Sequence, residues 1–208
     1  MKLQSTAKAV AVAAALAFLP IGAADAKPKV GATAPTFTGQ SATGETIKLG
    51  DLKRKTVVLE WTNKDCPYVR KHYETGNMQS LQKESKADHD VVWVSIISSA
   101  PGRQGYLEPV EALDNIKQTE AAPDHLLLDP KGEIGQSYGA VTTPHMYIIN
   151  PEGALVFMGG IDDNPSSRHS SVEGAKNFVR AALDDMAAGR KIAQAVTRPC
   201  GCSVKYAY

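Results

Sequence analysis

Cysteine is scarce in this chain, because only three of its 208 residues are cysteine: Cys66, Cys200 and Cys202. Three thiols cannot form a framework of several disulfides, and an odd number leaves at least one thiol unpaired. A chain of this length can bury an adequate hydrophobic core without disulfides. The three cysteines therefore indicate chemistry rather than scaffolding.

A hydrophobic run long enough to cross a membrane, which takes about 20 residues, is also missing. An apolar run of 11 residues, 9–19, follows two lysines and precedes a small-residue pattern at residues 24–26. This arrangement is typical of a cleavable secretory signal peptide. We therefore expect residues 1–26 to be removed. The mature chain would begin near Lys27, carry no membrane anchor and be periplasmic or secreted.

An excess of one charge sign is absent as well. The chain has 23 basic and 22 acidic side chains, and loss of the leader removes two basic and one acidic residue, which leaves the mature chain formally neutral. This balance argues against nucleic acid or a membrane surface as the main partner. We also expect no bound cofactor.

Apolar and amphipathic segments alternate along the rest of the chain. They predict a hairpin within residues 36–49, strands at 56–61, 91–97, 125–129, 145–150 and 154–160, and helices at 67–86, from Pro109, at 133–138 and at 170–189. The last helix is predicted to begin at Ser170, because Glu173 completes a capping box. The order predicts one α/β domain, residues 27–190, with a mixed central sheet and helices on both faces. A cysteine-containing tail, residues 191–208, follows it.

Cys66 lies between the strand that ends at Trp61 and a helix that begins at Pro67. Unpaired backbone N–H groups and the helix dipole favour a thiolate at such a position. The segment Cys66-Pro67-Tyr68-Val69 has the spacing of a C-x-x-C redox site, with valine in place of the second cysteine. Nearby cations that add positive charge are Lys64, Arg70, Lys71 and His72. An inert buried cysteine is the alternative.

Residues 57–68 and 138–153 resemble the exported thioredoxin and peroxiredoxin superfamily, and the similarity spans roughly residues 29–189. Further segments resemble its peroxiredoxin-like redoxin group: Cys-Pro-Tyr-Val at 66–69, residues 160–163, the helix end at 187–190 and the terminal Gly-Cys-Ser motif at 201–203. The resemblance implies a thioredoxin-like fold and antioxidant or thiol–disulfide chemistry, with Cys66 as the attacking thiol.

A thiol that attacks a disulfide forms a mixed disulfide, whose release needs a second thiol. The resemblance implies that Cys202 is this resolving thiol. Cys200 is an addition to the family pattern, and we expect it to act as a relay. Two alternatives stay open. One is a strained, readily reduced disulfide between Cys200 and Cys202. The other is a static Cys66–Cys202 disulfide without a catalytic role.

The resemblance also assigns roles to three residues outside the cysteines. Glu60 corresponds to a buried acid that moves protons to and from the resolving thiol, although an outward-facing carboxylate is the alternative. Pro144 corresponds to a cis-proline that faces the active cysteine, an ordinary trans turn being the alternative. The backbone of Thr143 would then bind an extended substrate peptide.

Two further activities are weighed against this expectation. Efficient peroxidase action is not expected, because the motif Pro-x-x-x-Thr/Ser-x-x-Cys is missing: Leu59 and Asn63 stand seven and three residues before Cys66. His145 and Met146, with Cys66 and His72, invite a Cu(I) site, since soft sulfur and imidazole ligands select this ion. The cysteine spacing of thioredoxin-fold copper chaperones is absent, so we expect no metal.

The sequence thus predicts an exported thiol–disulfide oxidoreductase. Its substrates would be disulfide- or thiol-containing proteins or small thiols, and an electron donor or acceptor protein would be its partner. An inefficient thiol peroxidase, a Cu(I)-handling protein and a redox-inactive binding module remain the alternatives.

Overall fold

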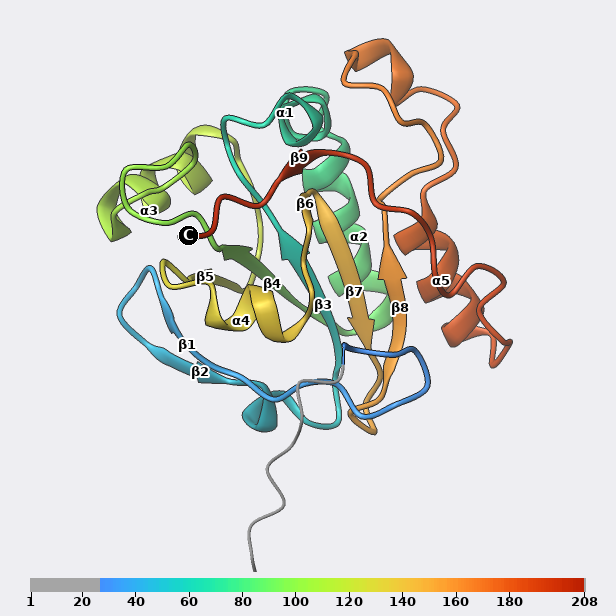
Figure 1. The fold of residues 1–208 in the computed structure, drawn as a ribbon. Coiled ribbons are helices and arrows are strands. Elements are labelled where there is room, and N and C mark those ends of the chain that lie inside the picture. Colours follow the sequence, from blue (N-terminus) through green and yellow to red (C-terminus); the bar gives the residue numbers. More distant parts are fainter. Residues whose placement is uncertain (1–26, 208) are drawn as a thin grey trace, which may run out of the picture.

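A computed structural model describes residues 27–207 and shows a seven-stranded central sheet (Figure 1). Its strand order is β2-β1-β5-β4-β3-β7-β8. The strands are β1 (Thr38–Ser41), β2 (Thr46–Lys48), β3 (Thr56–Trp61), β4 (Val91–Ile97), β5 (His125–Leu128), β7 (His145–Ile149) and β8 (Leu155–Gly159). Because β3, β4 and β5 pair in parallel and the other pairs are antiparallel, the sheet is mixed, as predicted.

Helices cover both faces of this sheet. They are α1 (Pro67–Glu74), α2 (Asn77–His89), α3 (Pro109–Gln118), α4 (Glu133–Ser137) and α5 (Phe178–Ala187), with 3-10 turns at Leu49–Leu52 and His169–Ser171. Residues of α2 and α5 share one core cluster, whereas α4 packs in the cluster on the opposite face. No helix among residues 27–207 is long and apolar enough to cross a membrane.

Strand β3 lies inside the sheet, between β4 and β7, and is buried on both sides. Since side chains alternate along a strand, Val57 and Leu59 face the cluster that contains α4, while Val58 faces the cluster under α2 and α5. Glu60 has the same parity as Val58. The strand therefore carries a carboxyl group into an otherwise apolar layer.

The predicted hairpin, strands and most helices are confirmed, including the interruption of the helix that follows Cys66 at Gly76. The predicted start of the last helix at Ser170 is wrong. Residues 169–171 form only a 3-10 turn, and Gly174 adopts a left-handed conformation (φ 74°), which a continuing helix excludes. Helix α5 begins at Phe178 instead. Its N-cap is Asn177, whose side chain accepts a hydrogen bond from the Arg180 backbone N–H at 2.9 Å.

The C-terminal tail runs along the edge of the domain and across its end (Figure 1). It first pairs with β8, where Met158 N donates to Ala195 O at 3.0 Å. It then forms β9 (Cys202–Ser203), which pairs with β6 (Thr142–Thr143) in a second, two-stranded sheet. Val204 is buried beside β9, so the tail is packed against the domain at both ends. The predicted signal peptide, residues 1–26, lies outside the described residues.

Candidate functional site

Cys66 caps the N-terminus of α1, as predicted. Its backbone is extended (φ −81°, ψ 121°), Pro67 occupies the first helical turn, and its carbonyl oxygen accepts hydrogen bonds from Val69 N and Arg70 N. The side chain is fully buried. The strand-to-helix junction thus places the thiol where backbone donors converge, beneath other parts of the chain.

The loop before β7 faces this thiol. The Thr143–Pro144 peptide bond is cis, as predicted. The Cys66 thiol donates to Thr143 O at 3.0 Å, although 77 residues separate the two in sequence. Thr143 is also buried. The antiparallel pairing of β3 with β7, which sets Trp61 opposite His145, accounts for this approach.

The tail completes the cysteine pair. Strand β9 runs antiparallel to β6, with Cys202 opposite Thr143 and Ser203 opposite Thr142. In this register the Cys202 side chain and backbone both hydrogen-bond to the Cys66 thiol. All three cysteines are free thiols. The structure therefore brings Cys66 and Cys202 together without a covalent bond.

The two thiols differ in acidity. Burial raises the pKa of Cys66, but hydrogen bonds with the Cys202 side chain and backbone, with Thr143 and with the Val69 backbone lower it, and the balance falls below the ordinary value of 9.0. Burial, the hydrogen bond with Cys66 and the charge on Cys66 raise the pKa of Cys202 to about 11. Cys66 is therefore the more acidic member of the pair, and Cys202 keeps its proton to higher pH.

This asymmetry predicts a two-step titration. In the Cys200→Ser variant, the ultraviolet absorbance of thiolate should rise once below pH 9.0 and again near pH 11. In Cys66→Ser, Cys200→Ser the lower step should vanish and Cys202 should titrate below about 11, because its charged partner is gone. A single unshifted step for both thiols would contradict the assignment.

The same shifts link stability to pH with opposite signs. A lowered pKa for Cys66 in the folded state stabilises the fold above the unfolded pKa, and this contribution is lost as the pH falls through the folded value. The raised pKa of Cys202 gives the opposite dependence of stability on pH. Its contribution is present below 9.0 and is lost as the pH rises through about 11.

Cys200, two residues before Cys202, has a different environment from this pair. Its thiol is half-buried, 3.9 Å from Pro165 O, and it hydrogen-bonds with Tyr68, on the first turn of α1. A hollow of about 680 Å³ beside it is lined by residues of the tail and of the loop after β8, including Asp162, Thr197 and Gly201. Cys200 is thus more accessible than Cys66.

Glu60 is fully buried under α1 and α2, so the alternative of an outward-facing carboxylate is wrong. The groups that donate hydrogen bonds to it are Tyr73 Oη (2.7 Å), Gln82 Nε2 (3.3 Å), Trp93 Nε1 (2.9 Å) and Ser95 Oγ (2.9 Å). Burial nevertheless raises its pKa above 4.5. Within the described residues, no hydrogen bond links Glu60 to a cysteine.

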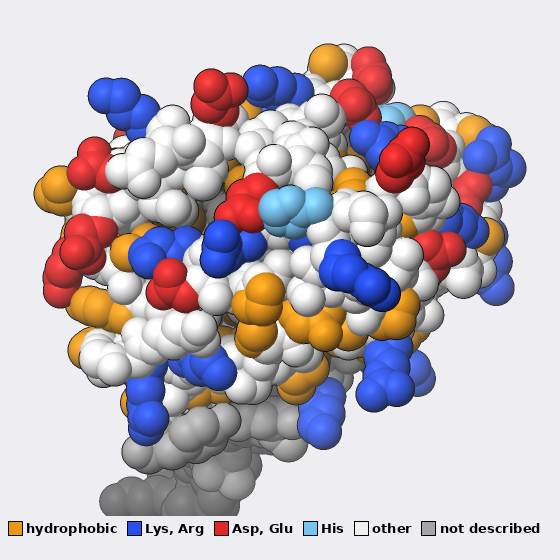
Figure 2. Space-filling view, turned by 90° about the horizontal axis from the view of Figure 1, so that it is seen from above, with side chains coloured by type: hydrophobic (Ala, Val, Ile, Leu, Met, Phe, Trp, Pro, Cys, Tyr) orange, Lys and Arg blue, Asp and Glu red, His pale blue; other side chains and the backbone are white. Residues whose placement is uncertain are grey.

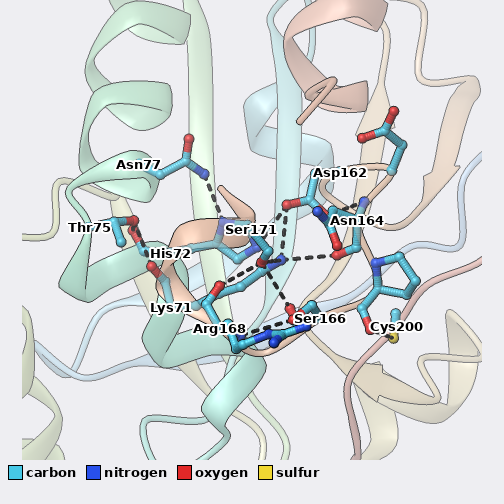
Figure 3. Close-up of polar contacts among 12 residues, drawn as sticks. Lys71, His72, Thr75, Asn77, Asp162, Asn164, Ser166, Arg168, Ser171 and Cys200 are labelled. Carbon is cyan, nitrogen blue, oxygen red and sulfur yellow. Dashed lines mark hydrogen bonds and ion pairs between the residues drawn. The ribbon is translucent and has the colours of Figure 1, made fainter. Parts of the chain in front are cut away.

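The cations near Cys66 in sequence point elsewhere. Lys64 and Arg70 pair with Asp65 and Glu74 on the surface. Figure 3 shows that Lys71 and His72 point from α1 toward the loop after β8. The largest effects that lower the pKa of Cys66 are hydrogen bonds and not the charges of these four residues.

Lys71 is the centre of a buried polar cluster that the sequence did not predict. Its ammonium group contacts Asp162 Oδ2 (3.1 Å), Asn164 O (3.1 Å) and Ser171 Oγ (3.3 Å), and it is only 2% exposed (Figure 3). His72 lies beside it, with its Nε2 3.6 Å from Asp162 Oδ2. Burial and the charge of Lys71 lower the pKa of His72 to about 3, so the imidazole is neutral at physiological pH. This cluster fastens the loop to α1.

The proposed copper ligands are not brought together. His145 Nδ1 lies 3.1 Å from the Tyr147 hydroxyl, and His72 Nδ1 contacts Asn77 at 2.8 Å. Met146 packs in the core cluster under α2 and α5. Among residues 27–207, no group of three or more His, Cys, Asp or Glu side chains is arranged to hold a metal ion.

Figure 2 views the end of the molecule that carries α1 and β9. Acidic and basic side chains are interspersed on this face, and a group of hydrophobic side chains is exposed among them. Val141, just before β6, and Val196, within the tail, are each 58% exposed. The region around the site therefore combines mixed charge with apolar surface.

Comparisons with known proteins agree with this architecture. The chain is 26% identical, over 141 residues, to sporulation thiol-disulfide oxidoreductase A of Bacillus subtilis (strain 168). The matched region covers 67% of this chain and 79% of that protein. An uncharacterized conserved protein from Geobacillus kaustophilus superposes with a TM-score of 0.75 at 23% identity, over 86% of this chain and 93% of that chain.

A putative thiol:disulfide interchange protein DsbE from Chlorobium tepidum superposes with a TM-score of 0.52 at 23% identity, over 64% of this chain and 85% of that chain. These structures confirm the thioredoxin-like fold. The model of the AhpC/TSA family matches residues 30–158, more than half of the chain. The chain therefore belongs to the AhpC/TSA family.

Proposed function

We propose that the protein is an exported thiol–disulfide oxidoreductase, in which Cys66 is the attacking thiolate and Cys202 the resolving thiol. The observation that supports this most directly is the contact between the two thiols, whose pKa values are shifted in opposite directions. A nucleophile needs a lowered pKa, whereas a resolving thiol must keep its proton until the first step is complete.

The exchange proceeds in two steps. The Cys66 thiolate attacks one sulfur of a substrate disulfide, a Cys66–substrate disulfide forms, and the other substrate sulfur leaves as a thiolate. Cys202 then loses its proton and attacks Cys66, which releases the second substrate thiolate and leaves a Cys66–Cys202 disulfide. The substrate gains two electrons and the cysteine pair loses two. The same steps in reverse oxidise a dithiol substrate.

Charge on Cys66 sets the order of these steps. In the resting pair, that charge and the hydrogen bond with Cys66 help to keep the pKa of Cys202 near 11. Both contributions vanish once the Cys66 sulfur is part of a mixed disulfide. The pKa of Cys202 then falls, so the resolving thiolate forms only once the mixed disulfide is in place.

Cys200 serves as the relay in this proposal. Its thiolate attacks the Cys202 sulfur of the Cys66–Cys202 disulfide, so that Cys66 leaves as a thiolate and a Cys200–Cys202 disulfide forms. A dithiol partner protein then reduces this bond. The half-exposed position of Cys200 beside an open hollow supports the assignment, because the partner can reach it more easily than Cys66.

Glu60 has a different place in the proposal. Its hydrogen bond to Tyr73 joins β3 to α1, whose other end presents Cys66. We therefore assign Glu60 to positioning the helix. The proton-transfer role predicted from the resemblance stays a prediction.

Thiol trapping of the mature protein followed by mass spectrometry tests the function. The oxidised wild-type protein should contain a Cys66–Cys202 disulfide that dithiothreitol reduces, and Cys202→Ser should accumulate a mixed disulfide between Cys66 and the substrate. If Cys66 forms no disulfide with a tail cysteine or a substrate, the protein is not an oxidoreductase of this type. A Cys66–Cys202 bond that resists dithiols would instead identify a static disulfide.

A further inference from the structure

The way in which the tail holds Cys202 defines a binding site for a peptide. We use the term tail strand for residues 201–204. It pairs with residues 141–143 through the β6–β9 register, in which Cys202 lies opposite Thr143, and through a hydrogen bond from Val204 N to Val141 O at 3.1 Å. Backbone groups make these contacts, so any extended chain could make them.

At Gly201 of the tail strand there is no room for a side chain. A Cβ atom on this residue would lie 2.0 Å from Thr143 O and 2.7 Å from Thr143 C. Both are backbone atoms next to the cis-proline, which cannot swing aside as the end of a flexible side chain can. The site therefore accepts only glycine immediately before the cysteine.

The two residues after the cysteine, Ser203 and Val204, differ in how much space their side chains have. Ser203 is exposed, so its position tolerates a range of side chains. Val204 is only 5% exposed and packs in the core cluster that contains Trp61 and Tyr138. That position favours an aliphatic side chain, because a charged group there would be buried without a partner.

We propose that the tail strand occupies the substrate site of the oxidoreductase, and that the external substrate is a protein with an extended Gly-Cys-x-aliphatic segment that replaces it. The inference rests on the proposed function, since it takes Cys66 as the attacking thiol. The Cys66 thiolate attacks the substrate cysteine at the position where Cys202 now lies. The sulfur previously bonded to that cysteine leaves as a thiolate.

The tail strand then competes with substrate. It is held on its C-terminal side by the hydrogen bond from Ala100 N to Lys205 O at 2.8 Å, and on its N-terminal side by the pairing of residues 195–197 with β8. Only the segment between these anchors must move. A methyl group at position 201 should loosen this segment and open the site.

The test uses the full mature chain with Cys200→Ser and Cys202→Ser, so that Cys66 is the one remaining cysteine. The reference peptide copies residues 199–205 with serine at position 200, and its cysteine is activated as a disulfide with an aromatic thiol. Release of the aromatic thiolate measures attack by Cys66. The matched peptides carry alanine for Gly201, alanine for Ser203 or aspartate for Val204, and the symmetric aromatic disulfide measures intrinsic reactivity.

The reference peptide should react at least about tenfold faster than the peptides changed at Gly201 or Val204, which is the discrimination that one misplaced group supplies. The peptide changed at Ser203 should react as fast as the reference. Adding Gly201→Ala to the protein should accelerate the reference peptide, with thermal melting as the control for folding.

Equal rates for the glycine and alanine peptides, with a reactive Cys66, would overturn this inference and leave the proposed function standing. Failure of Gly201→Ala to accelerate the reaction in the folded protein would overturn the competition by the tail. If Cys66 does not attack even the symmetric aromatic disulfide, the proposed function fails and the inference fails with it.

Discussion

Serine in place of Cys66 should reduce disulfide exchange by the protein at least about a thousandfold, the scale on which loss of a nucleophile acts. The structure gives the reason. Cys66 is the thiol whose pKa is lowered, and its sulfur contacts both Thr143 and Cys202. A serine hydroxyl stays protonated at neutral pH and cannot form a disulfide. Reduction of a chromogenic disulfide by a dithiol donor, catalysed by the protein, is the measurement.

Ser203→Ala is the matched control for this experiment. Ser203 lies next to Cys202 on β9, but its side chain is exposed and contacts Lys205 rather than the cysteine pair. The control should keep the wild-type rate and melting temperature. If Cys66→Ser retained more than about a tenth of the wild-type rate while Ser203→Ala was unchanged, the attacking thiol would lie in the tail.

Asparagine in place of Asp162 should lower the free energy of unfolding by about 3–5 kcal/mol, because it leaves the buried Lys71 ammonium group without its counter-charge. Lys71 is 2% exposed, and its other partners are a carbonyl oxygen and the Ser171 hydroxyl. The asparagine Oδ1 can still accept from Asn164 N, but its amide NH₂ would face the ammonium group. Urea unfolding at neutral pH measures the loss.

Burial raises the pKa of Asp162 and the charge of Lys71 lowers it, and burial dominates. The pair is therefore costly to bury, and removal of both charges is less harmful than removal of one. The double variant Lys71→Met, Asp162→Leu should be more stable than Asp162→Asn. Asp163→Asn is the control, since that exposed neighbour should lose less than about 1 kcal/mol. Equal losses at positions 162 and 163 would show that the ion pair contributes nothing.

Loss of this pair should also affect the site. The Lys71–Asp162 contact joins α1 to the loop after β8, and the same loop supplies Pro165 beside Cys200. A loosened loop therefore disturbs both the helix that presents Cys66 and the surroundings of Cys200. Helix α1 therefore carries both the buried ion pair and the cysteine of the candidate site.

Local patterns predicted most of the elements correctly. Apolar runs of strand length gave β3, β4 and β7, and the position of Cys66 before Pro67 gave the N-terminus of α1. The start of α5 was missed because the capping-box pattern at Ser170 and Glu173 stands just before Gly174, whose left-handed conformation ends the turn. The Ser171 hydroxyl in that turn hydrogen-bonds to Arg168 O and to the Lys71 ammonium group. Its contact with α1 therefore favours the turn over a continuous helix.

The sequence alone determined the fold family, the place of Cys66 at the N-terminus of α1 and the cis-proline opposite it, because these depend on residues close together in the chain or on a resemblance that such residues carry. Only the tertiary structure decided which thiol meets Cys66, why Glu60 is buried and where Lys71 finds its counter-charge. Thr143, Cys202 and Asp162 lie far from their partners in sequence. Contacts of this kind follow from strand register and loop packing, which bring distant residues together without leaving a local pattern.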